Sequence, residues 1–512
     1  MTVLSQAGAR DRADLGRVAR GGVLNLAGAG YAGLTGFGVT WLVARGLSPA
    51  DAGLFFASTA AFTVAVTVAK LGTPTGLVYW PAQLRDRPHL LRGMLRAALS
   101  PVAVAAVVLA AALWATGQLG ALILFLPLAA LTDSLLAATR GFRKPRPTVL
   151  YDKLLRPTLQ LGALGLALWL APGSPGVFTV AWAWAYLPVI FLAWQALPAL
   201  PPAGPGTVAG PFWRFTGPRA LASVAQQALQ RVDVILLAAL VTFTQAAYYA
   251  VAGRFVIVGQ LANQALAYSV QPQLAELLAA GDRPAARALY QSATGWVILL
   301  SWPVYLLAAV FAPLYLRLFG AEYRAAGGVV VILAGAMMVG SGCGMVDSVL
   351  AMAGRTSWNL LNVLAALGVN IGLDLLLIPG HGAVGAACGL AGAVLTNNLV
   401  PLAQLGWGLG LHPFGRGTVL AALLAATCFG AVPLGAVALL GRGSLGLAAA
   451  LGVGGALYGA GCWRLRRPLA LPTGGAARLR DLLASVRGLP GVPSAGAAAR
   501  LRRLIRSLRR KV

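Results

Sequence analysis

The segment FWRFTGPRALASVAQQALQRVDVILLAALV, residues 212–241, is long and apolar enough to cross a lipid bilayer, yet charged and amide side chains interrupt it. At 100° per residue, several of its polar residues fall within about 40° of one line along a helix. These residues are Arg219, Ser223, Gln226, Gln230 and Asp233. Because a polar stripe is costly against lipid, it has to face protein or water. We therefore predict one continuous helix here, which opens the second half of the chain and lines a cavity.

The rest of the chain has the composition of a membrane protein. Of its 512 residues, 58% are hydrophobic and only 10% are charged, whereas a soluble protein has about 25% charged residues. Apolar segments of about 20 residues recur between residues 21 and 464. The apolar run 21–44 is too long for a signal-peptide core, so we expect it to be the first retained span. The sequence predicts an all-α polytopic membrane protein with about 14 transmembrane helices.

The charges are distributed unevenly between the connections. The net charge is +27, and basic residues gather in 80–96, 140–156 and 271–290, while the alternate connections are short and nearly uncharged. The positive-inside rule then places both termini in the cytoplasm and the chain in the cell membrane, and it explains the charge without nucleic acid as a partner. The tail segment 496–511 is a basic amphipathic pattern that favours binding to anionic membrane lipids. The alternative is a disordered tail that only enforces topology.

An internal repeat relates two halves of the chain at a spacing near 194 residues. The hairpin 45–58 falls against 239–252, and the segment 85–95 corresponds to 281–291, each of the latter two containing Asp-Arg-Pro. The agreement of spacing, loop length and topology predicts two parallel six-helix lobes that enclose a central site and rock about it, as in transporters. The predicted units are an N-terminal lobe (1–200), a C-terminal lobe (201–406), two extra helices (407–464) and a cytoplasmic tail (465–512).

Four stretches carry a family resemblance. They are RGGVLNLAG (20–28), LVARGLSPADAGLFFAS (42–58), AKLGTPTGLV (69–78) and QRVDVILLAAL…AAYYAVAGR (230–254). In these the chain resembles the polysaccharide-biosynthesis flippases of the multidrug/oligosaccharidyl-lipid/polysaccharide exporter superfamily. The resemblance implies a MATE-like fold and a flippase that moves a polyprenyl-pyrophosphate-linked oligosaccharide to the outer leaflet for cell-surface polysaccharide biosynthesis. Lipid II flippases are close relatives of that family, and cation-coupled small-molecule antiporters share the fold.

The charges inside the spans fit such a cargo. Pyrophosphate needs cationic donors, and the planar fork of arginine suits phosphate oxygens, whereas a cavity for drug cations would favour acids and aromatics. We expect Arg219, Arg231, Arg254 and Lys70 to contact the pyrophosphate. Sugars need amides and hydroxyls, and the amide candidates for substrate binding are Gln226, Gln230 and Asn25.

Structural interpretations remain open for the same residues. Arg219 and Arg254 lie near span ends, where a long cationic side chain can reach the membrane interface without binding anything. Arg231 and Asp233 would alternatively pair with neighbours and serve only the fold. Acids within spans are the candidates for coupling to H⁺ or Na⁺: Asp233, Asp133 and Asp374.

The pattern does not indicate an enzyme. The three histidines and four cysteines are scattered, so neither a metal site nor a disulfide framework is predicted, and no cofactor is expected. Gly-rich runs lie inside apolar spans, where they favour helix packing over phosphate binding. A membrane glycan polymerase or ligase would need a long outer loop with catalytic groups, and the predicted outer loops are short.

Overall fold

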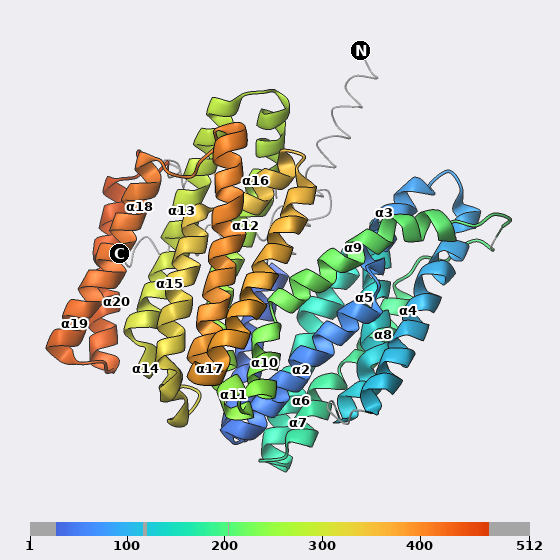
Figure 1. Cartoon of the computed structure of the whole chain (residues 1–512), viewed down its shortest axis with the longest axis horizontal. Helices are drawn as coiled ribbons and strands as arrows, with labels where there is room; N and C mark the ends of the chain where they lie inside the picture. Colours follow the sequence, from blue (N-terminus) through green and yellow to red (C-terminus); the bar gives the residue numbers. More distant parts are fainter. Residues whose placement is uncertain (1–26, 116–119, 203, 471–512) are drawn as a thin grey trace, which may run out of the picture.

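The computed structural model describes residues 27–115, 120–202 and 204–470, and within these ranges the chain folds into helices without any β-strand (Figure 1). Every predicted span lies mainly in helix there, which confirms the all-α polytopic fold. By length and composition, nine of the described helical segments can cross a membrane. One of them, α17 (Thr356–Leu409), covers two predicted spans. Its backbone is interrupted between them at Gly382 (φ 54°, ψ −131°), so it consists of two helices that meet at a kink. Asn25 and the tail segment 496–511 lie outside the described residues.

The helices form two lobes and an appended group. The N-terminal lobe comprises the helix of residues 27–46, α2 (Pro49–Ala69), α3 (Thr73–Gln83), α4 (Leu91–Trp114), α5 (Leu126–Gly141), α6 (Arg156–Leu170), α7 (Pro175–Ala183) and α8 (Tyr186–Gln195). The C-terminal lobe comprises α9 (Ala209–Leu229), α10 (Val232–Leu240), α11 (Phe243–Ala252), α12 (Val256–Ala279), α13 (Arg283–Val310), α14 (Ala312–Arg317), α15 (Gly327–Cys343), α16 (Val346–Met352) and α17. The appended helices α18 (Arg416–Ala426), α19 (Val432–Leu440) and α20 (Ser444–Arg464) pack against α13 on the outer side of the second lobe.

The segment 212–241 is two helices and not one, so the prediction of a continuous helix is wrong. α9 ends at Leu229, a turn spans Gln230 and Arg231, and α10 begins at Val232. The backbone amide of Gln230 bonds to the carbonyl of Gln227, which tightens the last turn of α9. The polar side chains of this segment therefore come from two helices and the turn between them.

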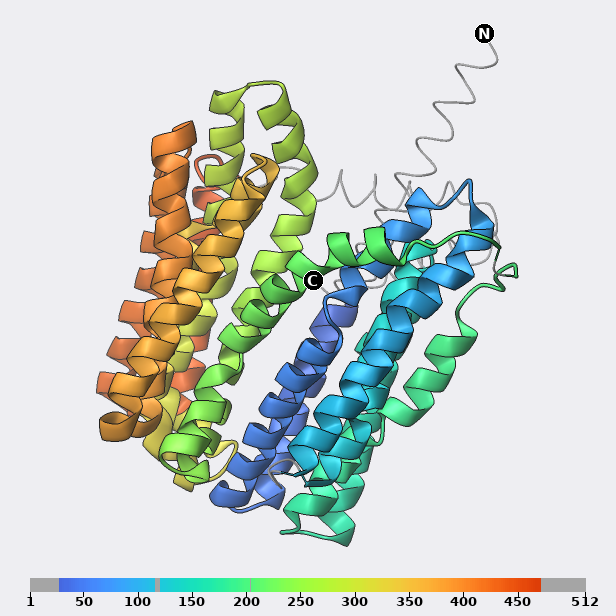
Figure 2. The same ribbon diagram turned by 45° about the vertical axis from the view of Figure 1, so that its right-hand side comes forward.

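The two lobes meet at one end and diverge toward the other (Figure 2). At the joined end α2 lies along α11, and a Cβ at Gly53 would overlap the carbonyl group of Phe243, so only glycine permits this approach. Nearby, the side chains of Trp41 and Arg45 donate to the carbonyl of Leu318 across the interface, at 3.0 and 3.1 Å. The α3–α4 connection and the α12–α13 turn lie at the diverging end.

The sequence repeat is visible in the caps of α2 and α11. The Ser48 hydroxyl accepts from the amide of Asp51 at 3.2 Å, and the Thr242 hydroxyl accepts from the amide of Gln245 at 3.3 Å. Each cap satisfies an amide that has no partner within its own helix. Since Thr242 follows Ser48 by 194 residues, both hairpins begin their second helix in the same way.

Candidate functional site

A polar cavity of about 510 Å³ lies between the lobes. Its walls come from the helix 27–46, α2 and α6 of the first lobe and from α12 of the second, together with four basic side chains: Lys153, Arg156, Arg231 and Arg254. A second hollow, of about 330 Å³, adjoins it and is lined by Gln226, Gln230 and Asp233. The two hollows share Arg231, Arg254 and Gln260. They therefore lie on either side of these shared side chains, two of which are cationic.

Arg231 and Arg254 are the cations without a counter-charge. Arg231 occupies the turn between α9 and α10, and Arg254 lies in the short 3-10 helix Gly253–Phe255 between α11 and α12. Neither forms an ion pair with any carboxylate in the described part of the chain, and the Nε of each is buried without a hydrogen-bond partner there. The Arg254 guanidinium lies 5.9 Å from the ring centroid of Phe56. Unpaired cations at membrane depth need water or an anion, so this part of the cavity can hold an anionic group.

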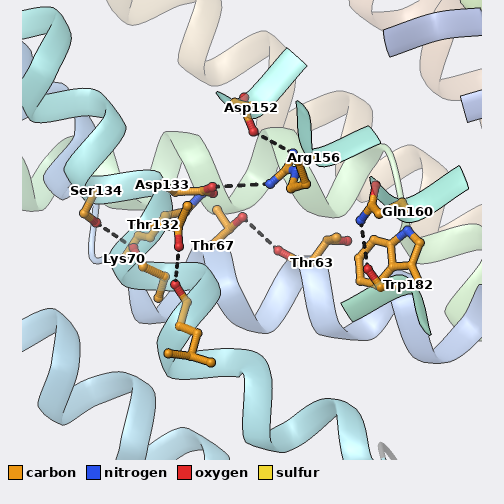
Figure 3. Close-up of polar contacts among 12 residues, drawn as sticks. Thr63, Thr67, Lys70, Thr132, Asp133, Ser134, Asp152, Arg156, Gln160 and Trp182 are labelled. Atoms are coloured by element: carbon orange, nitrogen blue, oxygen red, sulfur yellow. Dashed lines mark hydrogen bonds and ion pairs between the residues drawn. The ribbon is translucent and has the colours of Figure 1, made fainter. Parts of the chain in front are cut away.

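The first lobe instead contains a balanced network of charges (Figure 3). Lys70 Nζ lies 2.8 Å from Asp133 Oδ2, and Arg156 bridges Asp133 at 3.8 Å and Asp152 at 2.7 Å. The Arg156 guanidinium also lies 5.1 Å from the ring centroid of Tyr186. Lys70 and Arg156 are thus each paired with a carboxylate, unlike Arg231 and Arg254.

The network changes the interpretation of Lys70, Asp133 and Arg156. Lys70 was a candidate for pyrophosphate binding and Asp133 for coupling, but the structure pairs them with each other, and neither lines the two central hollows. Arg156 lines the cavity, yet it was counted only among the basic residues of a connection. Its signal in the sequence is the spacing of Asp152, Arg156 and Gln160, which a helix places on one face. Gln160 donates to the carbonyl of Trp182 at 3.1 Å.

The second lobe buries a pair of carboxylates. Asp233 of α10 is 3% exposed and Asp374 of α17 is 0% exposed. The amide of Asn370 donates to Asp233 Oδ1 at 2.8 Å and to Asp374 Oδ2 at 3.4 Å, and the Tyr249 hydroxyl donates to Asp233. Asp374 Oδ1 has no hydrogen-bond partner among the described residues. Two such carboxylates, buried side by side, need a shared proton or a bound cation.

The structure brings together some of the predicted site residues and not others. Gln226, Gln230, Arg231 and Arg254 surround the central hollows, and Asp233 and Asp374 share one cluster. Arg219 lines neither hollow. Its side chain is exposed, stacks on Phe215 at 3.8 Å and donates to that residue's carbonyl, which is the surface role left open above.

The fold is similar to that of flippases and transporters of the MOP superfamily. A structure of lipid II flippase MurJ in an inward closed conformation matches with a TM-score of 0.68 over 86% of this chain and 98% of that chain, at 12% identity. A multidrug resistance transporter of the MATE family, inward-facing, matches at 0.56 over 73% of this chain and 94% of its own, also at 12% identity. A MOP superfamily transporter from Pyrococcus furiosus, whose binding pocket is described as reversed in polarity, matches with a TM-score of 0.51. That match covers 76% of this chain and 94% of the transporter, at 14% identity.

These similarities are similarities of fold. No protein-family model matches the chain, and no curated protein matches it. The comparisons confirm the MATE-like architecture that the sequence predicted. The similar structures belong to transporters and flippases and not to enzymes. The kind of cargo has to be argued from the residues of this chain.

Proposed function

We propose that the protein is a flippase that moves a polyprenyl-pyrophosphate-linked oligosaccharide across the cell membrane by alternating access. The observation that carries the proposal is the pair Arg231 and Arg254, which line both central hollows and have no counter-ion among the residues described. A pyrophosphate supplies two adjacent anionic groups, and guanidinium groups bind phosphate oxygens through paired hydrogen bonds. The same pair would repel a cationic drug, which disfavours a multidrug antiporter.

The end at which the lobes diverge supports transport from the cytoplasmic to the outer leaflet. The lobes diverge at the end that carries the α3–α4 and α12–α13 connections. Both connections belong to the basic set that the positive-inside rule assigns to the cytoplasm. In that orientation the cavity faces the cytoplasmic leaflet, where a lipid-linked precursor is loaded, and both termini are cytoplasmic.

The acidic cluster is a candidate for coupling. Asp233 lines the smaller hollow and also bonds to Asn370 of the buried cluster, so it connects the cargo space to the carboxylate pair. Taking up H⁺ or Na⁺ at Asp233 and Asp374 would change the charge beside the hollow. We infer that cation binding here drives the return of the empty cavity.

Lipid II is the second candidate cargo. The observation that favours it is the match to a lipid II flippase over 98% of that chain. Lipid II and other polyprenyl-pyrophosphate glycans share the charged group that Arg231 and Arg254 are proposed to bind, so the two cargoes differ only in what is attached to it. Translocation assays with each lipid separate them.

The test uses purified full-length protein in proteoliposomes. Inward-to-outward movement of a polyprenyl-pyrophosphate oligosaccharide is followed by the access of a membrane-impermeant lectin or enzyme. Arg231→Gln and Arg254→Gln are expected to abolish movement, and Arg219→Gln, on the same lobe but outside the hollows, is expected to retain it. Unimpaired movement by both cavity variants would refute the proposal.

A further inference from the structure

A third hollow lies in the second lobe and has no part in the proposed pyrophosphate site. Its volume is about 250 Å³. The polar side chains that line it come from α12, from the start of α16 and from α17: Asn263, Gln264, Gln271, Asp347, Ser348 and Asn398. No lysine or arginine lines it. The polar side chains of its lining are therefore amides, one hydroxyl and one carboxylate, a combination unlike the cationic cavity.

Hydrogen-bonding groups in this hollow are only partly satisfied. Gln271 Nε2 donates to Ser348 Oγ at 2.9 Å, which ties α12 to α16 and fixes both side chains. Asn263 Oδ1 is buried and has no hydrogen-bond partner in the described ranges. Asp347 forms no ion pair with any residue in them. A buried group such as Asn263 Oδ1 is costly unless water or a polar ligand contacts it.

The hollow adjoins the cationic cavity. Gln264 lines both spaces. The helix α12 begins at Val256, two residues after Arg254. Gln264 lies about 12 Å along the helix from Val256, and Gln271 lies about 10 Å beyond Gln264. A molecule whose charged group contacts Arg254 can therefore extend along α12 into the amide-lined hollow, toward the diverging end of the lobes.

We propose that this hollow is a glycan subsite, which binds the sugars attached to the pyrophosphate. The inference rests on the proposed function for the class of cargo. Each sugar hydroxyl is both a donor and an acceptor, and amide side chains offer both partners in one plane. The Asp347 carboxylate accepts from two neighbouring hydroxyls but repels an anionic sugar. The subsite is therefore selective for neutral sugars, including N-acetylated ones, over uronic acids.

The experiment measures equilibrium binding of two lipids to the full-length protein in detergent. One is bare polyprenyl pyrophosphate, and the other carries a neutral oligosaccharide. Wild type is expected to bind the glycosylated lipid more tightly. Asn263→Ala and Gln271→Ala are each expected to lower the affinity for the glycosylated lipid about tenfold, as for the loss of one or two buried hydrogen bonds. Neither is expected to change the affinity for the bare lipid. Asp347→Asn keeps the side-chain shape and is expected to admit a uronic-acid glycan that wild type rejects.

Gln227→Ala is the matched control, because Gln227 is an amide of the same lobe that lines none of these three hollows. Thermal melting identifies any variant that fails to fold, and Asp347→Asn then carries the test. If the bare lipid binds in an Arg254-dependent way but the glycan adds nothing in wild type, the subsite is refuted and the proposed function stands. If the bare lipid binds equally well to Arg254→Gln, the proposed function fails and the subsite inference falls with it.

Discussion

Replacing Arg254 by glutamine should weaken cargo binding and stabilise the empty protein. A hydrogen-bonded arginine contributes about 1.5–3 kcal/mol toward a charged partner, so Arg254→Gln is expected to weaken binding of polyprenyl pyrophosphate about 10- to 150-fold. An arginine within a membrane costs about 2.5–3.5 kcal/mol on insertion scales. Because Arg254 is half-buried and faces a polar cavity, only part of that cost applies, and we expect roughly 1 kcal/mol of added stability.

Two measurements on the same samples check this prediction. Binding is measured by titration with bare polyprenyl pyrophosphate, and stability by thermal melting without ligand. Weaker binding together with a higher melting temperature identifies Arg254 as a residue that serves binding and destabilises the fold. A variant that melts earlier and binds as wild type does would show that Arg254 serves the fold, and the assignment of the cavity would be refuted.

Three further predictions concern the network, the acidic cluster and the joined end. Lys70→Gln removes the 2.8 Å partner of Asp133 and should lower the melting temperature while leaving affinity for the bare lipid unchanged; a stable variant with weakened binding would contradict this. Asp374→Asn should remove the dependence of transport on an imposed H⁺ or Na⁺ gradient without changing cargo affinity, and transport that still follows the gradient would exclude the cluster from coupling. Gly53→Val places a side chain on the carbonyl of Phe243 and should hold the joined end apart, which cysteine cross-linking between α2 and α11 would detect as slower bond formation.

The sequence predicted the spans and the repeat because both follow from local information. Hydropathy identifies segments of membrane length, and the offset of 194 residues pairs the caps at Ser48 and Thr242. The break at Gln230 and Arg231 was missed because helical periodicity does not register a two-residue turn that lacks glycine or proline. Such a turn is set by packing between elements, which one sequence does not reveal.

The candidate site was predicted in part for the same reason. Periodicity places Arg219 and Gln226 on one face of a helix, but it does not say which neighbour that face meets. Only Gln226 reaches the hollow. The pairing of Lys70 with Asp133 joins two helices that are 63 residues apart in sequence, so no local pattern indicates it. Arg156 was missed because its surroundings form only when α5, α6 and α8 pack together.

The interruptions of the second lobe have a mechanical consequence. Arg231 lies in the turn between α9 and α10, and Arg254 lies in the short 3-10 helix between α11 and α12. Turns at the ends of helices are where a lobe bends, because few residues there hold the chain in one geometry. In the proposed function, an anion that binds both guanidinium groups would contact the second lobe at two of its helix junctions. The residues proposed to bind the cargo would then also lie where the lobe can bend.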